Sequence, residues 1–350
     1  MFKFSAALKT AAILLSAIML FAACGDSQSS SEPGSSTPDA SSSDITSSDT
    51  VSVPEKPTET DFGVPIIEVS DTYGDLLAEI GGGKNLTALG ELSEPKYADA
   101  LSRLETSLKG YSKEFSLVAY TLDNKKAVSF NAETELFPAC TVKAFYSLYN
   151  CMEMDKGNGS LDTEMEYKYE HRDPDWGTGD MKFSKYGTVF DLKTIITKSL
   201  AISDNVGYNM QVSYFGRDGY NKWVSGVGCP SLQIKPTVWA LRTKADEHAV
   251  MWREIYRYLI NEDSKHAEFL YSAFTGTEGN FATKALEGVK YSHKQGFNSG
   301  GGWHSMSDAG IVWKDGNPYV IVMLTNSQGI TASAQSVMDD AINIIHNELF

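Results

Sequence analysis

A cysteine and a lysine stand three residues apart where a helix is predicted to begin, in the sequence FPACTVK of residues 137–143. Pro138 suits the first turn of a helix, where its missing N–H costs nothing, and apolar residues recur at helical spacing from Phe145 to Met152. This spacing places Cys140 at a helix N-terminus, with the Lys143 amine one turn further on the same side. A sulfur nucleophile at the positive end of a helix, with an amine within reach, is suited to covalent catalysis.

Two further short motifs carry groups that could serve this nucleophile. The sequence SDN at residues 203–205 lies between two predicted helices, and the sequence KQG at residues 294–296 lies on a predicted strand. Alone, SDN would be interpreted as an ordinary helix cap. Together, the motifs supply a sulfur, two amines and a hydroxyl. We expect these four groups, far apart along the chain, to converge on one cleft.

Helix and strand are predicted at both ends of the region that carries the motifs, with helices between. The other predicted helices are Pro95–Gly110, Asp191–Leu200, Asn205–Tyr214, Tyr220–Val224, Asp246–Ile260, His266–Phe274 and a closing helix with an apolar stripe from Ala334 to Ile345. The predicted strands are Phe115–Leu122, Ala127–Phe130, Val289–Phe297, Gly310–Trp313 and Tyr319–Thr325. The fold class is therefore α+β, with an all-α lobe inserted at about residues 140–285.

The N-terminal part has the features of an export and anchoring segment. Residues 1–23 combine lysines with an apolar run too short to cross a bilayer, which indicates a signal peptide. The sequence Ala-Ala-Cys ending at Cys24 resembles a bacterial lipobox, which implies lipid on that sulfur; a plain secretory signal is the alternative. Residues 24–64 are mostly Ser, Thr, Pro, Asp and Glu, typical of a disordered tether. Residues 65–94 are an N-terminal extension of uncertain structure, in which Tyr73–Ile80 could form a short helix.

Charge and cysteine content exclude several classes of protein. The net charge of −15 argues against nucleic-acid binding and against a polybasic membrane patch. Part of that charge is local, because residues 25–64 carry eight acidic residues against one lysine. Four cysteines are too few for a disulfide scaffold. The sequence leaves a Cys151–Cys229 disulfide possible, although two buried thiols are the favoured interpretation.

Read in order, the three motifs resemble those of the penicillin-recognising serine hydrolases, most closely the class A β-lactamase-like domain. The family pattern is Ser-x-x-Lys, Ser-Asp-Asn and Lys-Thr/Ser-Gly, and the resemblance covers about residues 95–350. It implies a β-lactamase/transpeptidase-like fold, with an antiparallel sheet flanked by N- and C-terminal helices. It also implies catalysis without a metal or other cofactor, and a β-lactam or peptidoglycan-type peptide as the ligand.

The resemblance also implies a role for each matching residue. Cys140 takes the nucleophile position, Lys143 that of the lysine that accepts its proton, and Ser203 that of the hydroxyl that relays a proton to the leaving nitrogen. The implied substrate-binding residues are Asn205, Lys294, Gln295, Gly296 and Phe297. Among these, Lys294 would face a substrate carboxylate. The backbone N–H groups of Cys140 and Phe297 would form an oxyanion hole.

Three departures from the family pattern bear on activity. The nucleophile is a cysteine, which beside Lys143 would form a thiolate–ammonium pair. Between Gly226 and Thr243, where class A enzymes carry the glutamate that activates the deacylating water, the chain has neither Asp nor Glu; Trp239 is near the expected position. Glu247 follows this stretch but is interpreted as a first-turn helix acid. Gln295 replaces a Thr or Ser.

Two hypotheses about function follow from the motifs and these departures. The first is a lipid-anchored acyl-transfer protein on the extracytoplasmic face of a bacterial cell membrane, acting on β-lactams or peptidoglycan-type peptides through Cys140. If active, it would be a β-lactamase-like hydrolase. The second is a non-catalytic protein that keeps the cleft to bind wall peptide or a protein partner.

Other polar and aromatic clusters are weaker candidates for a site. His171, Asp173 and Asp175 lack the spacing of metal ligands and are interpreted as a polar loop. His293 and His304 flank the third motif. The sequence does not decide whether they line the cleft or lie on the surface. The aromatic stretch from Tyr167 to Tyr186 could contact glycan, although packing over the insert is favoured.

Overall fold

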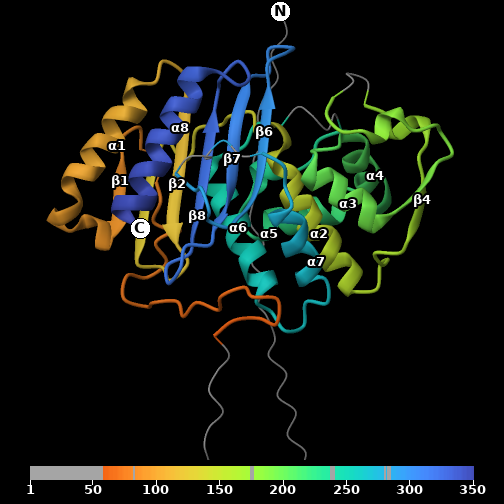
Figure 1. The fold of residues 1–350 in the computed structure, drawn as a ribbon, viewed down its shortest axis with the longest axis horizontal. Helices are drawn as coiled ribbons and strands as arrows, with labels where there is room; N and C mark the ends of the chain where they lie inside the picture. The colour runs from red at the N-terminus through yellow and green to blue at the C-terminus, as the bar shows by residue number, and fades with distance from the viewer. Residues whose placement is uncertain (1–57, 82, 174–176, 237–240, 280, 282–284) are drawn as a thin grey trace, which may run out of the picture. The chain divides into compact units, whose positions relative to one another are not determined.

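An antiparallel sheet of six strands is the centre of the folded chain (Figure 1). Its order is β1-β3-β2-β8-β7-β6, so β8, from the end of the chain, lies beside the early hairpin. The strands are Thr87–Gly90 (β1), Phe115–Thr121 (β2), Lys126–Phe130 (β3), Tyr291–Asn298 (β6), Ser305–Val312 (β7) and Tyr319–Thr325 (β8). A separate small sheet pairs Glu164–Glu166 (β4) with Val189–Asp191 (β5).

The computed structural model describes residues 58–350 except residues 82, 174–176, 237–240, 280 and 282–284. All of the described residues belong to the unit Glu55–Phe350. The expected signal peptide, Cys24 and most of the expected tether lie outside the described residues, as do Asp175, Trp176 and Trp239. Within the described part of the chain, no helix is both long and apolar enough to cross a bilayer.

The described part of the chain has eight α-helices. They are Ala98–Gly110 (α1), Lys143–Asp155 (α2), Leu192–Ala201 (α3), Asn205–Phe215 (α4), Asp218–Gly226 (α5), Ala245–Leu259 (α6), Ala267–Thr275 (α7) and Ala332–Ile344 (α8). Single-turn 3-10 helices are Glu91–Ser93 (η1), Pro95–Tyr97 (η2), Ala139–Val142 (η3), Tyr169–His171 (η4), Met181–Phe183 (η5) and Pro230–Leu232 (η6). A π-helical turn, Ile345–Leu349 (η7), extends α8.

The sheet is buried on both faces, which explains the continuous apolar runs of its central strands. Every residue of β2 and β8 is buried. Because successive side chains point to opposite faces, Leu117 and Ala119 enter one core while Val118 and Tyr120 enter the other. Helices α1 and α8 cover the first face, and α6 packs against β2 and β8 on the second (Figure 1). The predicted α+β fold is thereby confirmed.

Helix α2 passes through the middle of the all-α lobe. It contacts α3, α4, α6 and α7, and ten of its thirteen residues are buried. A helix buried on nearly all sides is fixed in position by its neighbours. The residue at its first position, Lys143, is therefore held rigidly in the interior.

Residues 65–94 differ from expectation because they contribute to the main body. The segment Tyr73–Ile80 forms turns rather than a helix, since its apolar run is too short to nucleate one. Its Leu76 and Ile80 are nevertheless buried in the core, and β1 pairs with β3 at the edge of the sheet. Val64, at the end of the expected tether, is also fully buried. The packed chain therefore begins before residue 65.

Strand β7 begins five residues before its predicted start at Gly310. Its first half carries Ser305, Ser307 and Asp308, which are polar yet fully buried. The hydroxyls of Ser305 and Ser307 are hydrogen-bonded to each other at 2.8 Å, and Ser307 Oγ also accepts the Thr325 N–H. Because these polar groups are satisfied inside the sheet, burial does not require an apolar pattern there.

Candidate active site

The nucleophile turn is a 3-10 helix, η3, that runs directly into α2. Pro138 precedes it, and Ala139 has φ 49°, a left-handed conformation that is costly for a residue with a Cβ. The sequence predicted that an α-helix begins here, whereas the structure has a 3-10 turn that precedes α2. Cys140 nevertheless lies at the start of the continuous helix that η3 and α2 form together. Its side chain is partly exposed and lines a cavity.

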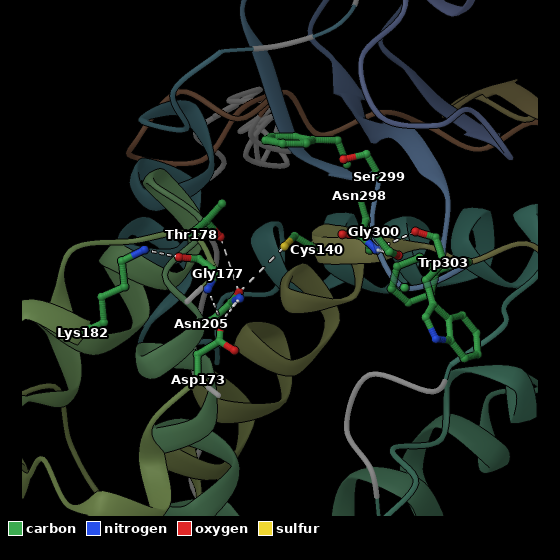
Figure 2. A pocket seen from close by; sticks show the side chains of 14 residues that line it. Cys140, Asp173, Gly177, Thr178, Lys182, Asn205, Asn298, Ser299, Gly300 and Trp303 are labelled. Atoms are coloured by element: carbon green, nitrogen blue, oxygen red, sulfur yellow. Dashed lines mark hydrogen bonds between the residues drawn. The ribbon is translucent and has the colours of Figure 1, made fainter. Parts of the chain in front are cut away.

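Lys143 is fully buried and its ammonium is surrounded by oxygens. Nζ donates to the Ser203 carbonyl at 2.5 Å and to Asn205 Oδ1 at 2.6 Å, and lies 3.4 Å from Ser203 Oγ. Asn205 Oδ1 also lies 4.0 Å from Cys140 Sγ (Figure 2). The amine predicted from the sequence is therefore next to the nucleophile and to the second motif.

The SDN motif is both a helix cap and part of the site. Asp204 caps α4 by accepting the Gly207 N–H at 2.8 Å, and its other oxygen accepts the Met181 N–H at 2.9 Å. Ser203 is held with φ 59°. Backbone strain of this kind persists only where the surroundings enforce it. Here the Ser203 carbonyl accepts from both Lys143 and Thr178, the latter at 2.5 Å.

Strand β6 brings the third motif to the same place. Lys294 is 1% exposed, and its Nζ donates to Ser203 Oγ at 3.0 Å and to the Gln295 carbonyl at 2.9 Å. Ser203 Oγ is therefore between the two lysine amines. The predicted convergence of sulfur, two amines and hydroxyl is present in the structure.

The free edge of β6 faces the nucleophile turn. Just before β6, the Trp313 N–H donates to the Lys290 carbonyl, in the same register as the β6–β7 pairing. Because hydrogen-bonded residues alternate along an antiparallel strand, the even-numbered residues of β6 are the ones whose backbone groups bond to β7. The backbone groups of odd-numbered residues, including the Phe297 N–H, then point to the open edge. A Cβ on Gly296 would lie 2.6 Å from the Cys140 nitrogen, which shows how closely this edge approaches η3.

A cavity of about 750 Å³ opens beside Cys140 and Asn205, whereas Lys143, Ser203 and Lys294 are not among its lining residues. Its lining residues come from η3 and Phe137 before it, from the segment before α3, from Asn205, and from the end of β6 with the glycine-rich loop that follows it (Figure 2). They are Phe137, Ala139, Cys140, Asp173, Gly177, Thr178, Lys182, Asn205, Phe297, Asn298, Ser299, Gly300, Gly301 and Trp303. The Phe137 and Trp303 rings are in contact, with centroids 5.2 Å apart, and form an apolar wall.

Comparison with known protein families shows the family of this chain. The Beta-lactamase enzyme family matches residues 97–349 of the chain. The chain belongs to the β-lactamase enzyme family. A comparison with curated protein sequences gave no match.

Solved structures show the same fold at low sequence identity. PBP-A is 16% identical with a TM-score of 0.63, over 71% of this chain and 95% of its own. A β-lactamase from Chitinophaga pinensis DSM 2588 is 17% identical with a TM-score of 0.63, over 71% and 98%. A PBP-A mutant solved as an acyl-enzyme complex with penicillin G is 17% identical with a TM-score of 0.61, over 71% and 94%.

The two lysines control the ionisation of Cys140 in this β-lactamase-family site. Burial by itself would raise the pKa of the thiol, but the positive charges of Lys143 and Lys294 outweigh it and lower the pKa below its ordinary value. Burial also lowers the pKa of Lys143, and it lowers the pKa of Lys294 to about 8. By contrast, burial raises the pKa of the Cys151 and Cys229 thiols. Cys140 is therefore the reactive thiol among the three described cysteines.

Asp173 is a member of the site that the motifs do not reveal. Its Oδ2 accepts the Asn205 Nδ2–H at 2.6 Å and the Gly177 N–H at 2.8 Å. The sequence predicts a polar loop at Asp173. The one feature that could have pointed to it is the cluster of acidic residues beside His171. Thr178 and Lys182, which also line the cavity, have no sequence signal. Among the described residues, no group of acids, histidines and cysteines suited to a metal is found.

Several other predicted residues lie away from the cavity. Gln295 is not among its lining residues, and its Nε2 donates to the Glu278 carbonyl at 2.8 Å. His293 is buried, not on the surface, with Nδ1 2.9 Å from Asp308. Glu247 is in the first turn of α6, as expected, and accepts from the N–H and hydroxyl of Ser231. It therefore holds the loop that precedes α6.

The cysteine and aromatic predictions have mixed outcomes. Cys151 and Cys229 are buried and free, so the favoured interpretation of two thiols is confirmed. In the stretch from Tyr167 to Tyr186, Tyr167 is buried. Tyr169, Phe183 and Tyr186 are exposed by 60%, 72% and 55%, so packing over the insert is wrong for these three rings.

Proposed function

We propose that this protein is an acyl-transfer enzyme of the cell envelope that uses Cys140 to open β-lactams or to cleave a peptidoglycan-type peptide. The observation that carries the proposal is the position of Ser203 Oγ between two buried amines beside the Cys140 thiol. Such a set can generate a nucleophile and return a proton to a leaving group. An acyl-enzyme complex is known for a PBP-A mutant of the same fold, in the case of penicillin G.

Acylation uses the contacts described above. Lys143 holds the thiol proton as an ammonium, and the Cys140 thiolate attacks the carbonyl carbon, forming a C–S bond. The C–N bond then breaks, and Ser203 Oγ passes its proton to the leaving nitrogen while Lys143 reprotonates Ser203. The Cys140 and Phe297 N–H groups would stabilise the oxyanion, at about 3 kcal/mol each. Lys294 would face a carboxylate on the leaving side.

Deacylation is expected to be slow. Water must attack the thioester carbon, breaking the C–S bond and returning the sulfur as a thiol. Between Gly226 and Thr243 the chain has no carboxylic acid to activate that water. The acyl-enzyme should therefore accumulate, and turnover of a chromogenic β-lactam such as nitrocefin should be low.

Incubation with benzylpenicillin is expected to add one penicillin mass to the protein, because ring opening releases no fragment. Intact-mass spectrometry with peptide mapping should place the adduct on Cys140, and Cys140→Ala should carry none. A wild-type protein that alkylates at Cys140 yet gains no adduct would contradict acyl transfer to β-lactams. If Cys140→Ala then also bound wall peptide as tightly as wild type, the non-catalytic binding protein would be the better account.

We also propose that the enzyme is lipid-anchored through Cys24 on the extracytoplasmic face of a bacterial membrane. The lipobox-like Ala-Ala-Cys sequence and the Ser/Thr-rich segment that follows support this. Cys24→Ser is expected to move the full-length protein from the membrane pellet to the soluble fraction and to abolish fatty-acid labelling. Cys151→Ser serves as the matched control, and membrane retention of Cys24→Ser would contradict the anchor.

A further inference from the structure

Three aromatic side chains of the helical lobe form an exposed group, which we call the aromatic platform. They are Tyr169, Phe183 and Tyr186, and each is more than half exposed. The Tyr169 and Tyr186 rings are in contact, and Phe183 is three residues from Tyr186, so those two Cα atoms lie within about 11 Å. Single exposed apolar side chains are ordinary, whereas a group of large exposed rings marks a binding surface.

Two rings of the platform are held in place by their neighbours. The Tyr186 ring lies against the buried Tyr167 ring, with centroids 5.2 Å apart, and edge-on to the Tyr169 ring at 5.8 Å. The Arg172 guanidinium lies 3.7 Å from the Tyr169 centroid. Backbone hydrogen bonds between Tyr167 and residues 187–188 fix the chain on both sides. Rings that are already fixed lose little conformational freedom when a ligand binds.

The third ring lies next to the cavity of the candidate active site. Phe183 is the last residue of η5, and Met181 at its start is buried and donates its N–H to Asp204 of the SDN motif. Between them, Lys182 lines the cavity, and its Nζ donates to the Gly177 carbonyl (Figure 2). The same Nζ lies 5.3 Å from the Phe183 ring centroid. The platform is therefore continuous with the cavity and attached to a catalytic motif.

The charges around the platform favour a neutral ligand. Residues 166–186 carry five acidic and four basic side chains, so this segment is close to neutral. Nucleic acid and anionic lipid are recognised by an excess of basic residues, which is not present here. A sugar ring fits, because the negative face of an aromatic ring attracts its slightly positive C–H groups. The sugar hydroxyls then bond to the polar side chains between the rings.

We propose that the aromatic platform binds a neutral polysaccharide chain whose peptide branch enters the Cys140 cavity. The inference deepens the acyl-transfer function proposed above and rests on it for the peptide branch. Several rings along one segment suit a chain of sugars, since each further sugar that stacks on a ring adds to the binding of the same chain. The substrate is then a peptide joined to a polysaccharide rather than a free peptide.

Peptide-free glycan strands of peptidoglycan are the probe, and isothermal titration of the full-length protein measures their Kd. The wild type is expected to bind them. Phe183→Ala and Tyr186→Ala should each raise the Kd about tenfold, because each removes one stacking ring. Tyr214→Ala is the matched control, since Tyr214 is 40% exposed on α4 and contacts Phe215 rather than the platform. It should leave the Kd unchanged.

Benzylpenicillin tests the cavity separately from the platform. Phe183 and Tyr186 are not among the lining residues of the cavity, and penicillin carries no polysaccharide. Both platform variants should therefore form the Cys140 adduct at the wild-type rate. This adduct also shows that each variant is folded.

The outcomes distinguish the platform from the function on which it rests. Failure of the glycan strands to bind the wild type would overturn the platform and leave acyl transfer intact, as would an unchanged Kd in both folded variants. Binding of the wild type to phosphatidylglycerol vesicles but not to glycan strands would replace the polysaccharide with a lipid surface. Glycan binding that depends on the rings, without any penicillin adduct, would support the platform and overturn acyl transfer to β-lactams.

Discussion

Replacing Lys143 with methionine is expected to slow alkylation of Cys140 by iodoacetamide at pH 7 by at least about tenfold. The thiolate is the species that reacts, and Lys143 is the larger of the two positive contributions that lower the pKa of Cys140 against the effect of burial. Methionine has a similar length but no charge, so the pKa of the thiol should rise. Peptide mapping would follow the modified cysteine.

The pH dependence of the alkylation rate shows in which direction the pKa of Cys140 changes. In the wild type the alkylation rate should fall as the pH drops through the lowered pKa of Cys140, because the thiolate is then protonated. In Lys143→Met that fall should occur at higher pH, and the two rates should converge where both thiols are ionised. The other groups that face this pair are Lys294 on β6, Asp204 and Tyr208 at α4, and Asp173.

Lys198→Met is the matched control, because Lys198 forms a partly exposed ion pair with Asp180. It should leave the profile unchanged. A wild-type pH profile in Lys143→Met, with a preserved thermal transition, would mean that Lys143 does not control the nucleophile.

Replacing Gly296 with valine is expected to have the second large effect. The first added atom would lie 2.6 Å from the Cys140 nitrogen and 2.9 Å from the Pro138 carbonyl oxygen, and both are backbone atoms that cannot rotate away. Strand β6 and η3 must then separate. Overpacking of this kind costs about 1–3 kcal/mol of stability. A shift of about 1 Å in reacting groups can reduce the acylation rate about 100-fold.

The measurements are a thermal melt and the rate of penicillin adduct formation. Gly110→Ala is the control, because nothing lies within 4 Å of the position of its Cβ at the end of α1. It should leave the acylation rate unchanged and stability equal or slightly higher. An acylation rate in Gly296→Val equal to that of the wild type would show that β6 does not position the nucleophile turn.

The sequence predicted the fold well where one physical pattern dominated. The closing helix, the β2–β3 hairpin and α6 were predicted within a few residues, since apolar spacing reports directly on a buried face. The first half of β7 and the edge strand β1 were missed. Strand β1 pairs with β3, from which α1 and β2 separate it in the chain, whereas β7 pairs with its chain neighbours β6 and β8 and satisfies its buried hydroxyls within the sheet.

The candidate site likewise has residues whose place the sequence predicted and one whose place it did not. Cys140, Lys143, Ser203, Asn205 and Lys294 could be named from short motifs in order, and the structure brings them together. Gln295, named in the same motif, faces Glu278 instead, because successive residues of a strand point in different directions.

By itself the sequence determined which groups are available: a thiol and an amine at a helix start, a hydroxyl in a helix cap and a second amine on a strand. Only the tertiary structure decided that the two amines flank Ser203 Oγ and that Asp173 binds Asn205. The physical reason is that hydrogen bonds and charge effects act over a few ångströms in space. Residues separated by 32 positions or more along the chain, such as Asp173 and Asn205, acquire them only when the fold is complete.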